Sequence, residues 1–314
     1  MNIRETILHN SSRMNRIRSQ DKWMKGFLIG SGFIIITLFI LFLLLLFTES
    51  GQSIKEFGLK FLYTHDWNPV SHVYGALPFI YGTIVSSIIA IVIGGVIGIL
   101  AALFLTQFAP SWLAKPLFFL IELLAAIPSV VYGLWGIFVL APLLRTSIEP
   151  WLQKYFGFLP IFQGSIFGVG MLAAGLILSI MILPTITSIA RDVIMTVPNE
   201  QKEAAIGIGA TKWEMIRLAI LPYAWPGILG GIMLGLGRAL GETMAVTMVI
   251  GNRPEISTSL FAPSYSMASV IANEFTEATT DIHISALMEI GLVLFAVTFI
   301  FYLISRILIR RVNN

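Results

Sequence analysis

The 314-residue chain contains no cysteine, so it forms no disulfide bond and no cysteine-ligated metal site. Charged residues are also scarce, at 12%, while hydrophobic residues make up 56% and the mean hydropathy is +0.86. A water-soluble domain carries charges on about a quarter of its residues. We therefore predict an all-α, polytopic membrane protein that crosses the bilayer several times.

Motifs for enzymatic chemistry are missing as well. Residues 207–212 read GIGATK, but Trp213 follows where a phosphate-binding loop needs serine or threonine after its Gly-Lys pair. HExxH and GxSxG do not occur, and His65 and His72 lack the spacing of metal ligands. The chain is therefore predicted to be no enzyme and to bind no metal or cofactor. If ATP drives its activity, ATP-Mg must be bound and hydrolysed by a separate subunit.

Six apolar segments are long enough to cross a hydrocarbon core of about 30 Å. The third contains Pro128 and Gly133, which we predict to bracket a kink that acts as the pivot of a gate. Gly94, Gly98 and Ala102 lie four residues apart in the second segment, which favours close packing against a neighbouring helix. The predicted spans are residues 26–47, 77–108, 112–144, 164–189, 223–250 and 284–304.

The distribution of lysine and arginine predicts the orientation of these spans. One set of connections and tails holds 14 basic residues and the other holds five, with Arg238 left inside a span. Basic residues collect on the cytoplasmic side, so both termini and the connection 197–222 are expected in the cytoplasm. The predicted organisation comprises basic tails at 1–25 and 307–314, a first helix and outer loop at 26–76, and a membrane domain at 77–306.

Residues 197–222, VPNEQKEAAIGIGATKWEMIRLAILP, form the most polar connection between two spans. Asn199 is expected to cap a short helix, and the glycines around Ile208 to end it. Thr211 and Glu214 have the spacing of a capping box that opens a second short helix. Pro222 is expected to end that helix near Leu221, because proline disfavours helical geometry in the preceding residue. The segment is thus predicted to be a helix-turn-helix, which we call the elbow.

The elbow resembles the E-A-A loop of ABC-importer permeases. Glu203-Ala204-Ala205, Gly209 and Leu221-Pro222 match that pattern in register, while Ala219 stands where the family prefers isoleucine. The resemblance implies a coupling helix that docks onto a cytoplasmic ATPase. The apolar face expected to permit close approach of the partner consists of Ala204, Ala205 and Ile208. Without the resemblance, the elbow is an ordinary surface hairpin between two spans.

The fifth span carries two charges, Arg238 and Glu242. Their spacing of four residues places them on one helical face, where they are expected to pair directly. A charge near the bilayer centre costs roughly 2.5–3.5 kcal/mol on insertion scales and therefore favours a functional site. An arginine fork suits a tetrahedral oxyanion, and Thr243 adds a hydroxyl to the path. The alternative is a salt bridge that only fixes the orientation of the helix. The third span adds Glu122, whose protonation state the sequence leaves open.

Four strings sharpen the resemblance over residues 81–306: IPSVVYGLWG, GRALGETMAV, LFAP and ASVIANEF. Together they are similar to permease subunits of bacterial phosphate importers, which have the type I ABC permease fold. The resemblance implies that Arg238 and Glu242 take part in phosphate movement. It also implies four partners: a second permease subunit, an ATPase dimer at the elbow, an extracytoplasmic phosphate-binding protein at the outer loops, and the bilayer. No nucleic-acid partner is predicted.

Two other functions remain open from the residues alone. An importer of another oxyanion, such as sulfate or molybdate, would use the same elbow and the same arginine. A channel or secondary transporter that works without ATP would leave the elbow with no evident use. ATP-driven sulfate uptake would support the first alternative, and ATP-independent phosphate uptake would support the second.

Overall fold

The computed structural model describes residues 3–312, with side chains described for residues 20–307. No strand forms in the described part of the chain, where two isolated bridges are the only extended pairing. Six of its helical stretches are long and apolar enough to cross a membrane, which confirms the predicted fold class. These stretches are Gln20–Glu49, Leu77–Phe108, Ser129–Phe156, Met171–Met195, Lys212–Gly241 and Asp281–Ile307.

The chain divides into two compact units, residues 1–49 and residues 50–314. The first unit consists of one long helix, α1 (Ile3–Glu49). Residues 3–25, predicted as a polar tail, are therefore helical and continuous with the first span. No proline and no glycine precedes Gly26, so nothing in the local sequence interrupts the helix before the apolar run begins.

In the second unit, α9 (Met171–Met195) is the central helix, and most of its side chains are buried. It packs against α3 (Leu77–Ala90), α4 (Val96–Leu103), α5 (Ser111–Ala126), α12 (Leu221–Gly241) and α13 (Met244–Val249). A Cβ atom at Gly94 would lie 2.6 Å from the Ser179 carbonyl oxygen, and one at Gly98 would lie 3.2 Å from the Ile186 side chain. The predicted small-residue stripe is therefore confirmed as the contact with α9.

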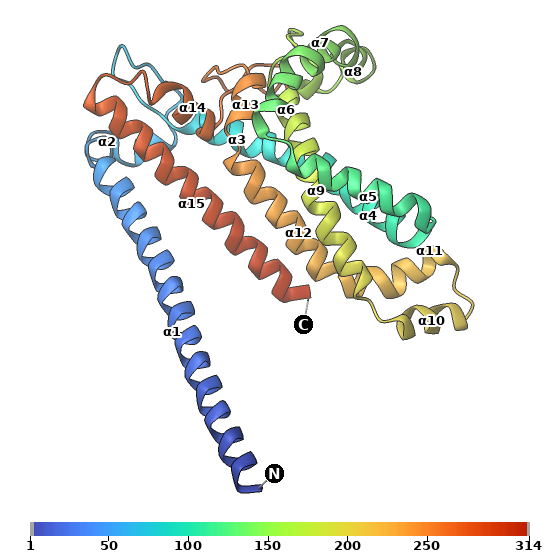
Figure 1. The fold of residues 1–314 in the computed structure, drawn as a ribbon. Coiled ribbons are helices and arrows are strands. Elements are labelled where there is room, and N and C mark those ends of the chain that lie inside the picture. Colours follow the sequence, from blue (N-terminus) through green and yellow to red (C-terminus); the bar gives the residue numbers. More distant parts are fainter. Residues whose placement is uncertain (1–2, 313–314) are drawn as a thin grey trace. The chain divides into compact units, whose positions relative to one another are not determined.

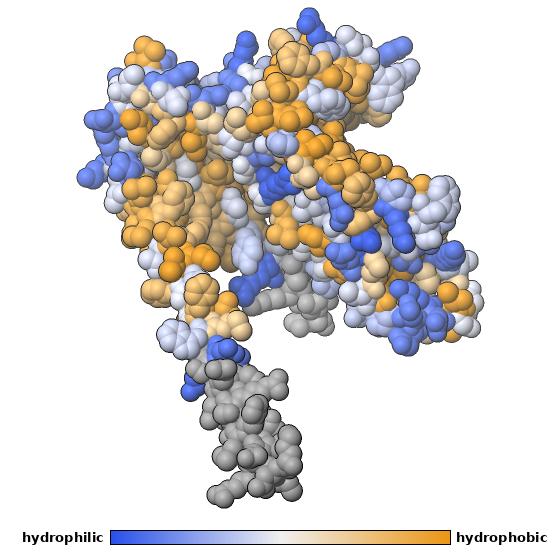
Figure 2. Space-filling model, viewed as in Figure 1, coloured by the Kyte–Doolittle hydropathy of each residue, from blue (hydrophilic) through white to orange (hydrophobic). Residues whose placement is uncertain are grey.

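Shorter elements complete the second unit. The outer connections contain α2 (Gly51–Phe57) and α14 (Met267–Glu274), so the predicted loop 252–283 is partly helical. Figure 1 shows the elbow helices, α10 (Asn199–Gly207) and α11 (Lys212–Met215), at the end of the unit opposite α14. Figure 2 shows apolar side chains covering much of the flanks, with hydrophilic residues gathered around α10, α11 and α14. The remaining elements are α6 (Ser129–Trp135), α7 (Ala141–Leu143), α8 (Glu149–Phe156) and α15 (Asp281–Val312).

Three predicted spans have wrong boundaries. The fifth, predicted as 223–250, is the helical stretch Lys212–Gly241. The third span starts at Ser129 instead of residue 112 and runs to Phe156 through two π-helical turns, while α5 is a separate helix. The fourth begins at Met171 instead of residue 164, because Gly168 takes the left-handed conformation with φ +77°. The Gly168 amide donates a hydrogen bond to the carboxylate of Glu149 at 3.1 Å, which fixes this turn against α8.

Substitution of Gly82 by alanine should destabilise the fold. An added Cβ would lie 2.2 Å from the Tyr265 carbonyl oxygen, and backbone cannot move aside as a flexible side chain does. We expect a loss of about 1–3 kcal/mol in the free energy of unfolding, measured by denaturant titration in detergent. The matched control is Gly230→Ala in α12, where nothing lies within 4 Å. It should be neutral or stabilise by up to about 1 kcal/mol. Equal behaviour of the two variants would contradict the packing argument.

Candidate functional site

The helix that carries Arg238 ends three residues later. α12 stops at Gly241, Glu242 is extended with ψ 125°, and α13 starts at Met244. The prediction that Arg238 and Glu242 share one helical face and pair directly is therefore wrong. The Glu242 carboxylate instead accepts a hydrogen bond from the Ala245 amide at 3.3 Å. This bond satisfies one of the first-turn amides that a helix leaves without a partner, and so favours the break.

Arg238 lies half-buried in the last turn of α12, where its Nη1 donates to the Thr185 hydroxyl of α9 at a long distance of 3.5 Å. The ion pairs among the described side chains join Arg191 to Asp192 and His283 to Glu274, so no carboxylate of residues 20–307 forms an ion pair with Arg238. A Cβ atom added at Gly237 or Gly241 would have no neighbouring atom within 4 Å, so there is open space on either side of the arginine in sequence. A guanidinium in this setting is available to an anion.

A second helix break lies between α5 and α6. Ile127 and Pro128 are both extended, with ψ 128° and 141°, so the predicted kink is a complete interruption. In a continuous helix the Leu124 carbonyl would accept from residue 128, but proline has no amide hydrogen. The Tyr132 hydroxyl donates to this carbonyl at 2.7 Å, and the Ile127 amide lies 3.3 Å from it. Tyr132 thus bridges the break from the far side.

The two breaks are joined through packing of α6 against α13. A Cβ atom at Gly133 would lie 3.1 Å from the Ala245 Cα and 2.4 Å from the Met248 sulfur. Gly133 is therefore a point of close approach and not part of a kink. Interrupted helices within the membrane are tolerated where they are buried or line a watery cavity, and they are a common feature of transport sites. Pro128, Gly133, Glu242 and Thr243 belong to this paired break, with Arg238 one helical turn away.

Removal of the Tyr132 hydroxyl should weaken the α5–α6 junction. Tyr132→Phe keeps the buried ring but loses the 2.7 Å hydrogen bond to Leu124, which should cost about 0.5–1.5 kcal/mol of unfolding free energy. Denaturant titration of the two proteins in the same detergent measures the difference. Tyr155→Phe is the control, because Tyr155 is exposed and its hydroxyl donates no hydrogen bond to any described residue. A destabilisation no larger than that of the control would argue against the bridge.

The elbow forms as two short helices, with two differences from the predicted helix boundaries. Gly209 takes φ +89° and turns the chain after α10, and Thr211 and Glu214 form the predicted capping box at α11. Asn199, however, is the first helical residue of α10 and does not cap it. α11 does not end at Pro222 but continues through a π-helical turn, Ile216–Ile220, into α12. This wide turn accommodates the proline, whose missing amide would break a regular helix.

The exposed face of the elbow differs from the predicted one in a single residue. Ala205 is 8% exposed and packs in the chain's own core beside Met215 and Ile216, whereas Ile208 is 82% exposed. A groove of about 450 Å³ lies between α10 and the start of α12. Ala204, Ala205 and Pro222 of the matched pattern line it, while Glu203, Gly209 and Leu221 do not. Its other lining residues are Gln201, Ile208, Leu218, Ala219 and Tyr223.

Comparison with known proteins identifies the family to which the chain belongs. Residues 94–314 match the family model of the binding-protein-dependent transport system inner membrane component. The chain belongs to this family. The phosphate transport system permease protein PstC of Mesorhizobium japonicum is 50% identical over 272 residues, covering 85% of this chain and 83% of that one. PstC of Pasteurella multocida is 51% identical over 269 residues, with 84% of each chain covered.

Solved structures of ABC transporters share the fold. A bacterial ABC transporter involved in the import of the acidic polysaccharide alginate superposes with a TM-score of 0.56 at 17% identity. The alignment covers 90% of this permease and 95% of that chain. The inward-facing MetNI methionine ABC transporter gives a TM-score of 0.52 at 18% identity, covering 76% of this permease and 94% of that chain.

Glu122 of the permease is exposed on α5 and lines a cavity of about 440 Å³ with Lys115 and Arg191. The Arg191 guanidinium lies over the Phe118 ring at 3.7 Å from its centroid, which joins α9 to α5. Glu122 is therefore not buried in this subunit, and basic groups share its cavity.

Several polar groups of the permease are not predicted from its sequence. Thr185 is one of them, because a threonine in an apolar span carries no signal of its own. The Ser53 hydroxyl donates to the buried Glu289 carboxylate at 2.5 Å, and His283 pairs with Glu274 at 3.1 Å. The first of these contacts joins residues far apart in the chain, and the second joins two different helices. The only sequence feature that pointed to these contacts was an acidic residue within an apolar stretch, Glu289.

Proposed function

We propose that the chain is a permease subunit of an ATP-driven importer of inorganic phosphate and forms half of its translocation pathway. The observation that carries this proposal is the half-buried Arg238, which has no ion-pair partner among residues 20–307 and lies one turn from two joined helix breaks. An arginine fork offers paired donors to two oxygens of a tetrahedral oxyanion. Identity of about 50% to the PstC proteins supports phosphate as the substrate.

The elbow is the proposed contact with a separate ATPase dimer. Its groove has small residues at Ala204 and Ala219, so a partner side chain can approach the backbone closely. Since α11 runs without interruption into α12, a push on the elbow is transmitted along one helix to Arg238 and to the break at Glu242. ATP binding and hydrolysis in the partner would thereby tilt the spans between outward and inward openings.

The remaining assignments follow from this arrangement. The excess of basic residues on the elbow side supports cytoplasmic termini in the inner membrane. A second permease subunit completes the pathway. An extracytoplasmic phosphate-binding protein delivers the anion at the end of the second unit where α14 lies. Glu242 keeps the path near neutral without pairing directly with Arg238, and Thr243 lies beside it at the break.

Radiolabelled uptake into proteoliposomes tests the proposal. The assembled transporter, with ATP inside and the binding protein outside, should accumulate phosphate, and excess unlabelled sulfate should not compete. Protonated phosphate donates a hydrogen bond that sulfate cannot, so a site built for phosphate discriminates strongly. ATP-driven sulfate uptake would replace phosphate by another oxyanion, and phosphate uptake without ATP would replace the importer by a channel.

A further inference from the structure

A patch of exposed aromatic side chains lies on and just after α8, the short helix that ends the third span. Trp151 and Tyr155 are four residues apart, so they share one face of α8, and their ring centroids are 5.4 Å apart. Phe158 lies two residues beyond the helix and is 75% exposed. We call these three residues the aromatic patch. In Figure 1, α7 and α8 lie at the end of the second unit opposite the elbow.

The other faces of α8 are attached to the rest of the second unit. Leu152 packs against the main hydrophobic core, and the buried Glu149 carboxylate accepts a hydrogen bond from the Gly168 amide at 3.1 Å. The side-chain amide of Gln153 donates to the Gly164 carbonyl at 2.9 Å. The aromatic patch is therefore presented by a segment whose other side chains are already held in place.

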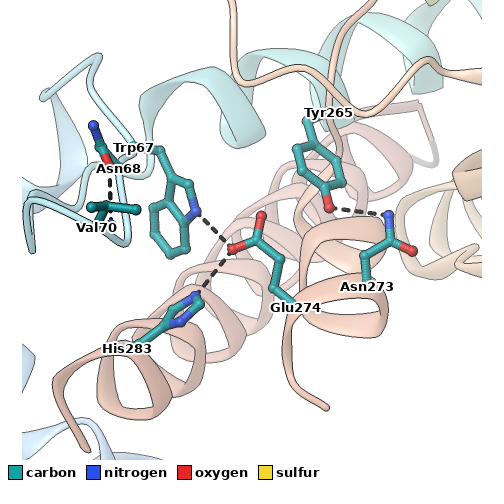
Figure 3. Close-up of polar contacts among 7 residues, drawn as sticks. All are labelled: Trp67, Asn68, Val70, Tyr265, Asn273, Glu274 and His283. Atoms are coloured by element: carbon teal, nitrogen blue, oxygen red, sulfur yellow. Dashed lines mark hydrogen bonds and ion pairs between the residues drawn. The ribbon is translucent and has the colours of Figure 1, made fainter. Parts of the chain in front are cut away.

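A second tryptophan at the same end shows what a buried indole requires. Trp67 is 9% exposed, packs against two other aromatic rings, and donates its indole N–H to the Glu274 carboxylate at 2.9 Å (Figure 3). Trp151 is 54% exposed, and neither its N–H nor the Tyr155 hydroxyl has a hydrogen-bond partner among residues 20–307. An apolar ring with an unpaired polar tip suits a boundary that is apolar on one side and wet on the other.

α8 lies at the depth where two spans meet the membrane surface. It ends the third span, Ser129–Phe156, whose 28 residues exceed the roughly 20 that a hydrocarbon core requires. Its first residue, Glu149, is bonded to Gly168, just before the fourth span begins at Met171. The aromatic patch is therefore at the level of the lipid headgroups, where tryptophan and tyrosine are enriched in membrane proteins.

The charge and the size of the side chains favour lipid over a helix of another subunit. Residues 149–163 contain two charged residues, the buried Glu149 and the exposed Lys154, so the exposed charge is positive. The Lys154 ammonium lies 5.4 Å from the Tyr155 ring centroid, and such a side chain can extend to lipid phosphates. Contacts between membrane helices use small residues, but α8 contains no glycine and no alanine.

We infer that the aromatic patch is a membrane anchor that binds phospholipids in the leaflet on the side of α14. The rings lie among the upper acyl chains, while the indole N–H, the Tyr155 hydroxyl and the Lys154 ammonium donate to phosphate and ester oxygens. The same helical stretch carries Gly133 and its contact with α13, so the anchor holds the paired break at a fixed depth. The inference holds for any transported solute and does not depend on the proposed function.

Fluorescent labels on single cysteines measure the depth of the aromatic patch in the assembled transporter. The chain has no cysteine of its own, so Tyr155→Cys and Phe158→Cys each give one labelled site when the other subunits are cysteine-free. In nanodiscs, phospholipids brominated at two depths should quench both labels and place them about 5–10 Å inside the headgroup boundary. Iodide dissolved in the water should quench them only weakly.

Val70→Cys provides the control for the label itself. Val70 lies with α14 at the same end of the second unit and is almost fully exposed, so its label should be quenched by iodide and not by brominated lipid. Labels at 155 and 158 that iodide quenches as strongly as the label at 70 would show a solvated patch. Labels that neither quencher reaches would show a patch covered by protein. Either result would overturn the membrane anchor, and unchanged thermal unfolding of each labelled transporter would exclude loss of the fold as the cause.

Discussion

Exchange of Arg238 for glutamine is expected to lower ATP-driven phosphate uptake by roughly a hundredfold or more. Hydrogen bonds to charged groups are worth about 1.5–3 kcal/mol each, and an arginine fork makes two of them to one oxyanion. Loss of about 3 kcal/mol corresponds to roughly a hundredfold in rate. Glutamine keeps a polar side chain of similar length at position 238. Among the described residues, the change removes one side-chain hydrogen bond, the 3.5 Å contact with Thr185.

The size of the effect in related variants separates anion binding from helix orientation. Arg238→Lys retains the charge without the fork and should keep an intermediate uptake, measurably above that of Arg238→Gln. Thr185→Val removes the hydrogen-bond acceptor of Arg238 on α9 and should reduce uptake by only a few-fold, about the value of one neutral hydrogen bond. If Arg238→Gln transported at the wild-type rate, the guanidinium would have only a structural role. ATP hydrolysis by the same preparations shows whether the transporter remains assembled.

Local chemistry was predictable where neighbouring residues determine it. Thr211 and Glu214 are three residues apart and form their capping box through each other's backbone and side chain. Gly209 takes the left-handed conformation that a glycine there allows. The glycines at 94 and 98 face α9 because small residues four apart make a groove on one side of a helix. In each case the residues that determine the conformation or the contact lie close together in the sequence.

The breaks in the helices could not be located from spacing alone. Arg238 and Glu242 have the separation of a same-face pair, but the Glu242 carboxylate bonds to the Ala245 amide and α12 ends before it. At Pro222 the opposite occurred, because a π-helical turn let the helix continue where proline suggested an end. Both outcomes depend on which group satisfies a backbone amide or carbonyl, and several solutions fit the same sequence.

The contacts at the end of the second unit that carries α14 depend on the complete fold. Trp67 and Glu274 are separated by 207 positions, so their hydrogen bond gives no sequence signal. Among the described residues, Glu274 and His283 are not part of any group of three acidic or histidine side chains that could hold a metal ion. The excess of acidic residues in 252–283 was the only sign that this connection has a role of its own.

Introduction of a tryptophan at Ala204 is expected to abolish coupling between ATP hydrolysis and transport. Ala204 is exposed at the groove of the elbow, where a methyl group leaves room for a partner side chain. An indole there would fill the part of the groove next to residue 204 and exclude that side chain. Anchor residues at interfaces are worth about 2 kcal/mol or more, so ATP-driven phosphate uptake should fall by at least about thirtyfold. Docking of the extracytoplasmic binding protein should not change.

Ile206→Trp provides the control that makes this prediction specific to the groove. Ile206 is exposed on the same helix but does not line the groove, so its replacement adds a ring without filling the groove. Uptake by Ile206→Trp should stay near the wild-type rate, while Ala204→Trp should lose both uptake and co-purification of the ATPase. Equal activity of the two variants would place the ATPase elsewhere. Since α11 continues into α12 through Pro222, the second helix of the elbow would then be only the first part of the helix that carries Arg238.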